Sequence, residues 1–79
     1  MKVRILFFGA TADEAGMRSL EVAVDRPANV GDALERLMDR FPKLRDHKLR
    51  FAVNQEYVSN DRTLNDGDEL AVFTAVSGG

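Results

Sequence analysis

One amphipathic helical pattern stands among short alternating segments, and this arrangement limits the folds open to the chain. Between residues 30 and 41, apolar side chains recur at helical spacing, which predicts one helix with a single apolar face. Asn29 and Asp32 have the spacing of a capping box at its start, and Pro42 stops it. One such face must be buried against a sheet. The apolar positions are Val30, Ala33, Leu34, Leu37, Met38 and Phe41.

Five short segments around this helix have the alternation or the composition of strands. In the first of them, Val3, Ile5 and Phe7 would point to one face of a sheet. The order of two strands, one helix and three strands predicts an α+β protein with a mixed sheet of about five strands. The first and last strands can lie side by side, which is the β-grasp, or ubiquitin-like, arrangement. The expected strands cover 3–8, 18–24, 51–53, 56–58 and 69–73.

The size and composition of the chain exclude several classes of function. Its 79 residues allow one domain, which we expect over 1–73, followed by a tail over 74–79. A net charge of -2 does not indicate the basic surface that binds nucleic acid. The lack of cysteine excludes thiol catalysis and cysteine-ligated metals. Nothing resembles a signal peptide, and no apolar stretch approaches the roughly 20 residues that span a bilayer. We therefore expect a cytoplasmic protein.

The tail is the strongest candidate for a functional site. It is uncharged and, fully extended, its six residues would span about 20 Å, enough to enter the cleft of a partner protein. Glycine has no Cβ, so Gly78 and Gly79 could pass through a narrow channel and leave the terminal carboxyl unhindered. That carboxyl becomes reactive once adenylation supplies a leaving group, and a sulfur donor could then displace AMP to form a thiocarboxylate. The residues before the two glycines are Val76 and Ser77.

Four segments of the chain together resemble the MoaD family, the small sulfur-carrier subunits of molybdopterin synthase within the wider MoaD/ThiS group. The resemblance covers almost the whole length, but Thr74 and Ala75 stand where the family usually has two prolines. The matching segments are 3–9, 51–58, 63–73 and 76–79.

This resemblance implies a β-grasp fold and a reaction sequence that runs through Gly79. An E1-like, MoeB-like enzyme would adenylate Gly79 with ATP, and a sulfurtransferase would supply the sulfur of a thiocarboxylate. The tail would then enter a large MoaE-like subunit in a heterotetramer, and the sulfur would pass to a pterin precursor to form the dithiolene of the molybdenum cofactor. The chain itself would be a non-catalytic subunit without a bound cofactor or metal.

Three alternatives remain open, and two of them also use an adenylated Gly79. A related carrier could serve thiamine thiazole, cysteine or tRNA thiolation. A ubiquitin-like modifier would transfer the adenylated Gly79 to a lysine, and a plain interaction domain would not use the tail at all.

Phe8 and Phe73 are candidate partner-binding residues, because the strand alternation places both on the face away from the helix. Either they cover each other or a loop, or they form a docking patch for the large subunit, since exposed aromatic residues favour interfaces.

Three groups of polar residues are interpreted as surface and turn residues. His47 has no second histidine nearby, so a metal or catalytic role is not expected. The acidic group suits turn chemistry better than calcium, because its spacing does not match an EF-hand. Its members are Asp61, Asp66, Asp68 and Glu69. The basic residues after the helix are Arg40, Lys43, Arg45, Lys48 and Arg50.

Overall fold

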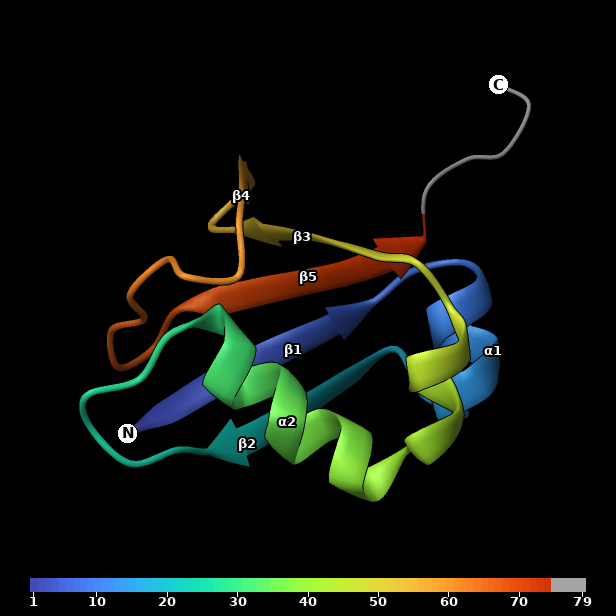
Figure 1. Ribbon diagram of the computed structural model, residues 1–79, viewed down its shortest axis with the longest axis horizontal. Coiled ribbons are helices and arrows are strands. Elements are labelled where there is room, and N and C mark those ends of the chain that lie inside the picture. Colours follow the sequence, from blue (N-terminus) through green and yellow to red (C-terminus); the bar gives the residue numbers. More distant parts are fainter. Residues whose placement is uncertain (75–79) are drawn as a thin grey trace.

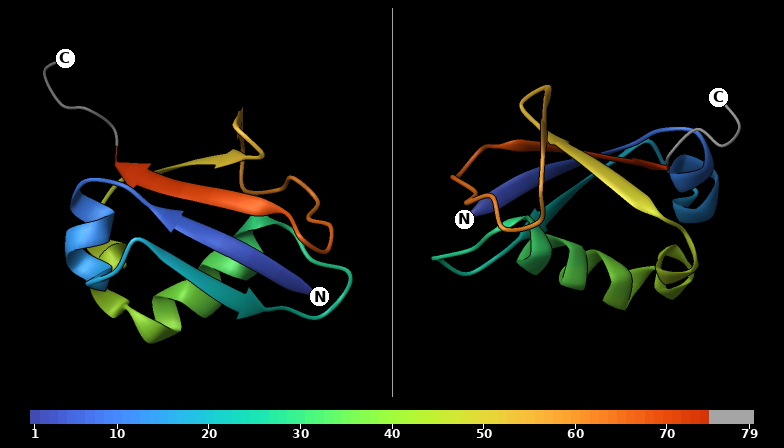
Figure 2. Two further views of the ribbon diagram at one scale, coloured as in Figure 1. Left: turned by 180° about the vertical axis from the view of Figure 1, so that it is seen from behind. Right: turned by 45° about the horizontal axis from the view of Figure 1, so that its top comes forward.

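The computed structural model describes residues 1–74, and it has a five-stranded mixed sheet with one main helix across one face (Figure 1). Turning the molecule shows the same two layers from behind and from above (Figure 2). This confirms the predicted α+β, β-grasp architecture. The elements are β1 (Lys2–Phe7), α1 (Ala10–Ala15), β2 (Ser19–Ala23), α2 (Val30–Arg40), the 3₁₀ helix η1 (Pro42–Asp46), β3 (Leu49–Val53), β4 (Glu56–Val58) and β5 (Glu69–Thr74).

The last strand lies in the middle of the sheet. The strand order is β2-β1-β5-β3-β4, with β5 parallel to β1 and antiparallel to β3. The first and last strands are therefore neighbours, as the element order predicts. In the pairing register, Phe7 lies opposite Val72, so β1 and β5 end at the same edge of the sheet.

The alternation in the strands matches the burial of their side chains. Val3, Ile5 and Phe7 are buried on one face of β1, and Leu70 and Val72 are buried on the same face of β5. This face packs against α2, as the predicted helical stripe requires. The buried side chains of α2 are Val30, Ala33, Leu34 and Leu37.

The capping box predicted for α2 is present. The Asp32 N–H donates to the Asn29 side chain at 2.9 Å, and the Asn29 N–H donates to the Asp32 carboxylate at 2.9 Å. The helix ends one residue earlier than predicted, because Phe41 leaves helical geometry with a φ of -126° ahead of Pro42. The Phe41 ring still packs edge to face on Phe7, at a centroid separation of 6.0 Å.

Two segments differ from the sequence-based expectation. The segment after α2, whose basic residues were interpreted as surface residues, contains η1, whose Leu44 is fully buried. The third strand begins at Leu49 rather than at residue 51, because Leu49 and Arg50 pair with the end of β5. Sequence alternation alone could not show this pairing, since it depends on where β5 ends.

Two turns contain residues with positive φ. Asn54 and Gln55 have φ values of 50° and 71°, which is the geometry of a tight hairpin between β3 and β4. Gly67 has a φ of 86°, a conformation that glycine adopts without strain. Between residues 1 and 74, no helix is long and apolar enough to cross a membrane.

Candidate functional site

The central strand β5 leads directly into the C-terminal segment. Thr74 is the last described residue, and it still pairs with Leu49 of β3. The strand that carries the tail is thus held on both sides by its neighbours. The predicted tail residues Val76, Ser77, Gly78 and Gly79 lie outside the described residues.

A buried threonine ties the end of β5 to α1. The Thr11 hydroxyl is fully buried and lies 2.7 Å from the carbonyl oxygen of Val72 and 2.9 Å from that of Phe8. It also accepts a hydrogen bond of 3.0 Å from the Phe8 N–H. Sequence reasoning missed Thr11, because a single threonine in a short connecting segment carries no pattern that marks it as buried.

The sheet face opposite α2 carries an apolar patch beside the end of β5. The register places Leu6, Ala71 and Tyr57 in one row across the sheet, through Ala52. Phe8 and Phe73 lie two residues beyond Leu6 and Ala71, and therefore on the same face. We call this set the outer patch. Its residues are Leu6, Phe8, Tyr57, Ala71 and Phe73.

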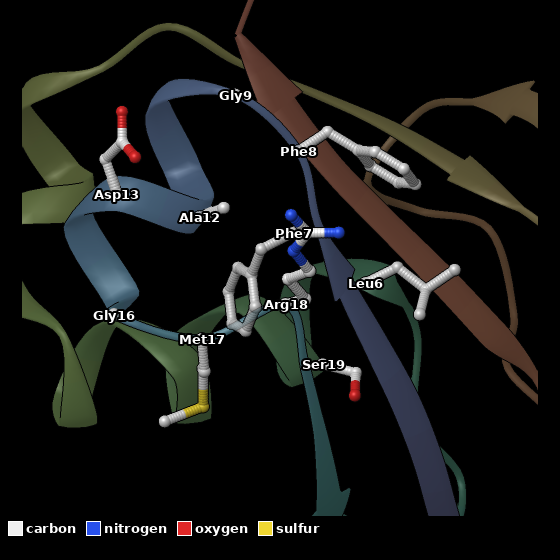
Figure 3. Close-up of a pocket in the computed structure, with 10 residues that line it drawn as sticks. All are labelled: Leu6, Phe7, Phe8, Gly9, Ala12, Asp13, Gly16, Met17, Arg18 and Ser19. Atoms are coloured by element: carbon white, nitrogen blue, oxygen red, sulfur yellow. The ribbon is translucent and has the colours of Figure 1, made fainter.

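The two predicted aromatic residues are both in the outer patch, but they are not equally covered. Phe8 is 52% exposed, so neither Phe73 nor a described loop covers it. Phe73 is half-buried and packs on Tyr57, with ring centroids 5.9 Å apart. Leu6 and Phe8 point to the same side of β1 (Figure 3). Among residues 1–74, Phe8 and Tyr57 are the exposed large apolar side chains.

Sequence reasoning missed Tyr57 as a member of the patch. Its strand, β4, has three residues, which is too short for alternation to assign a face. The pairing of Tyr57 with Ala52 supplies that assignment, and this pairing is visible only in the structure.

A charged row bounds the outer patch on the side away from the tail. Arg4 lies opposite Glu21 on β2 and opposite Glu69 on β5. Lys2 adds an exposed ion pair to Glu21, with Nζ and Oε1 3.7 Å apart. The apolar part of this face is therefore confined to the end from which β5 leads into the tail.

The acidic residues fix turns, as the sequence indicated. Asp68 is buried and accepts hydrogen bonds from the Asn54 amide at 3.1 Å and from the Asn65 N–H at 2.7 Å. Asp66 accepts a bond of 2.7 Å from the Lys2 N–H, which holds the pKa of its carboxyl below the ordinary value of 3.8. Asp61 accepts a hydrogen bond from Ser59. In the described part of the chain, no group of three acidic, histidine or cysteine side chains could hold a metal ion.

His47 and two residues of the basic run have structural partners. His47 Nε2 lies 3.2 Å from Glu14 Oε1, which connects the end of η1 to α1. In the basic run, Arg45 lies 3.5 Å from Glu35, and the Arg40 guanidinium lies over the Phe41 ring at 5.6 Å. These contacts join neighbouring elements, and they assemble no catalytic cluster in residues 1–74.

Comparison with known proteins gives matches over nearly the whole chain. The ThiS family matches residues 5–79. The molybdopterin synthase sulfur carrier subunit of Escherichia coli is 43% identical, over 98% of this chain and 99% of its own length. The protein of the same name from Mycobacterium tuberculosis is 37% identical, over 100% of this chain and 99% of its own. The crystal structure of small archaeal modifier protein 1 from Haloferax volcanii superposes with a TM-score of 0.88, at 34% identity and with complete coverage of both chains.

Proposed function

The chain belongs to the ThiS family, and we propose that it is the sulfur carrier subunit of a molybdopterin synthase. The observation that carries the proposal is the full-length identity of 43% and 37% to two proteins of that name. The structure is consistent with it, because a central strand leads into the tail and an exposed apolar patch lies beside that strand. In this role the chain is a non-catalytic subunit, and the residues that complete the reaction belong to its partners.

The chemistry that we propose takes place at the carboxyl of Gly79. A carboxylate oxygen attacks the α-phosphorus of ATP on an activating enzyme of the E1-like class, and pyrophosphate leaves. A sulfur nucleophile from a donor protein then attacks the acyl carbon, and AMP leaves with the electrons of the broken C–O bond. When the nucleophile is a persulfide of the donor, this step gives an acyl disulfide. A thiol then attacks the donor's sulfur, the S–S bond breaks, and the tail leaves as a thiocarboxylate while the donor and the thiol are left joined in a disulfide. The carrier needs no bound cofactor for these steps, because the activating enzyme uses the ATP.

The outer patch is the proposed docking surface for the large synthase subunit. Aromatic side chains are enriched in protein interfaces, and Phe8 and Tyr57 are exposed although both are large and apolar. A partner seated on this patch would have the root of the tail, at Thr74, beside its contact area. Docking and insertion of the tail would then occur together, in the cytoplasm where we place both subunits.

A reconstituted reaction tests this function. The chain carrying a thiocarboxylate is mixed with the large subunit and the pterin precursor, and dithiolene formation is followed. We expect product to form, and we expect none with a chain that lacks Gly79. Full activity of the shortened chain would contradict the proposal.

A protein modifier is the second candidate. The observation that favours it is the match to small archaeal modifier protein 1, which is 37% identical over 91% of this chain. In that case the adenylated Gly79 would form an isopeptide bond with a lysine of another protein. Adducts of higher mass that resist thiol reagents, and that disappear when Gly79 is deleted, would identify this activity.

A further inference from the structure

An open groove of about 850 Å³ borders the outer patch, between α1 and the start of β2 (Figure 3). Its apolar lining comes from three segments that meet at this corner of the molecule: the end of β1, the exposed side of α1 and the connection to β2. Arg18 supplies a cation to this lining, and Ser19 a hydroxyl. The apolar lining includes Leu6, Phe8, Ala12 and Met17.

The local backbone holds Arg18 beside the end of β1. Gly16 ends α1 with a φ of 71°, and its N–H donates to the Ala12 carbonyl at 2.8 Å. The chain reverses there, so that the Arg18 carbonyl accepts a bond of 2.9 Å from the Phe7 N–H. The side chain of Arg18 extends from this anchored backbone toward the end of β1 (Figure 3).

The guanidinium of Arg18 is exposed and has no carboxylate partner among residues 1–74. Three other arginines of the described residues are compensated, since Arg45 and Arg62 form ion pairs and Arg4 lies between two glutamates of neighbouring strands. Asp13 also borders the groove, but it points away from Arg18 on the far side of α1 (Figure 3). The positive charge of Arg18 is therefore available to another molecule.

The groove is continuous with the outer patch, because Leu6 and Phe8 belong to both. A stable protein interface buries about 800 Å² on each partner, which is more than a few side chains provide. A partner that covers the outer patch would therefore extend onto neighbouring surface. The charged row of Arg4, Glu21 and Glu69 bounds the patch on one side, whereas the groove extends it with apolar side chains.

We propose that this groove receives an acidic side chain of the protein that docks on the outer patch, and that Arg18 anchors that carboxylate. An arginine guanidinium binds a carboxylate through two parallel hydrogen bonds, and such a pair strengthens when docking removes water. The apolar lining suits a segment in which the aspartate or glutamate has apolar neighbours. The inference rests on the docking of the large synthase subunit proposed above.

This contact makes Arg18 a specificity-determining residue. A partner with a neutral or basic side chain at this point would leave the guanidinium covered and unpaired, which costs binding free energy. The outer patch alone offers no such discrimination, because apolar contacts accept many apolar partners. Arg18 thus selects among proteins that could otherwise cover the same patch.

The test measures the affinity of the full chain for the large synthase subunit by calorimetry, at low and at moderate salt. We expect Arg18→Gln to weaken binding about 10- to 100-fold and Arg18→Glu to weaken it further. The salt dependence of the affinity should become flatter in Arg18→Gln, because one charge pair is lost. Arg36→Gln is the matched control, because Arg36 is an exposed arginine on α2, which covers the opposite face of the sheet, and the affinity of this variant should stay within about twofold of the original.

Phe8→Ser separates this inference from the docking proposal. If Phe8→Ser binds as tightly as the unchanged chain, the docking proposal is wrong and the inference is overturned with it. If Phe8→Ser weakens binding but both Arg18 variants bind normally, docking stands and the role of Arg18 is overturned. Circular dichroism would verify that the variants fold, which we expect because Arg18 and Phe8 are exposed.

Discussion

At the scale of single residues, Thr11 shows how one buried hydroxyl can organise the region next to the proposed functional tail. It joins the end of β1, the first turn of α1 and the carbonyl of Val72 in β5. The last described residue, Thr74, lies two positions beyond Val72. The stability of this corner of the molecule should therefore depend on a residue that no sequence motif marks.

Replacing Thr11 with valine tests this role. The substitution keeps the shape of the side chain but leaves the Val72 carbonyl without its hydroxyl partner. We expect the free energy of unfolding to fall by about 1–3 kcal/mol in urea titrations. Thr63→Val is the control, because Thr63 is exposed and its side chain makes no hydrogen bond in the described structure. Equal stability of Thr11→Val and the unchanged chain would contradict the account.

Asp66 should make stability depend on pH on the acid side. Its pKa is lowered in the folded chain, chiefly by the hydrogen bond from the Lys2 N–H. A carboxyl of this kind stabilises the fold above its unfolded pKa, near 3.8, and loses that contribution as pH falls through the folded pKa. We expect Asp66→Asn to have a lower Tm than the unchanged chain at neutral pH and the same Tm in strong acid.

Thermal unfolding followed between strong acid and neutral pH would measure this difference. Asp25→Asn is a suitable control, since Asp25 is exposed and its side chain has no hydrogen-bond partner among the described residues. A Tm difference for Asp66→Asn that does not change with pH would show that the carboxylate has no part in it.

At the scale of elements, the sequence predicted the helix and the faces of the long strands correctly, because each is set by local periodicity. The strand of Val3, Ile5 and Phe7 has alternation enough to assign its buried face. The short strand β4, which contains Tyr57, has too few residues for alternation to assign a face. Only the pairing of Tyr57 with Ala52 places it in the outer patch. The buried Leu44 was missed for a related reason, since one leucine in a polar segment forms no period.

The capping box of α2 offers a test at this scale. Asn29→Ala removes the acceptor for the Asp32 N–H, which should reduce the free energy of unfolding by about 0.5–2 kcal/mol. Asn29→Asp keeps a side-chain oxygen at the same place and should restore most of the loss. Denaturant titrations of the two variants would measure their free energies of unfolding. An Asn29→Ala chain as stable as the Asn29→Asp chain would mean that the cap contributes little to the stability of the fold.

At the scale of the whole molecule, the sheet topology brings together residues that are far apart in the sequence. The residues of the outer patch meet on one face because β5 lies between β1 and β3. Sequence alternation predicted the faces of Phe8 and Phe73, but it could not predict that Tyr57 covers Phe73 while Phe8 stays exposed. The groove beside Phe8 was likewise beyond prediction, since it depends on how α1 packs.

Tyr57→Ser measures the contribution of the outer patch to docking. The side chain is 80% exposed, so its loss should change the free energy of unfolding little. If it is an interface anchor, affinity for the large synthase subunit should fall at least tenfold, which corresponds to about 1.4 kcal/mol. An exposed serine elsewhere, produced by Asn60→Ser, should bind normally. Unchanged affinity of Tyr57→Ser would remove this residue from the interface.

The central claim is that the chain carries sulfur on its terminal glycine, and intact-mass spectrometry after activation tests it most directly. The chain is incubated with its activating enzyme, ATP and a sulfur donor, and compared with a chain that lacks Gly79. We predict a mass gain equal to the exchange of one oxygen atom for one sulfur atom, confined to the C-terminal peptide and absent from the shortened chain. A full-length chain whose mass does not change under these conditions would contradict the account.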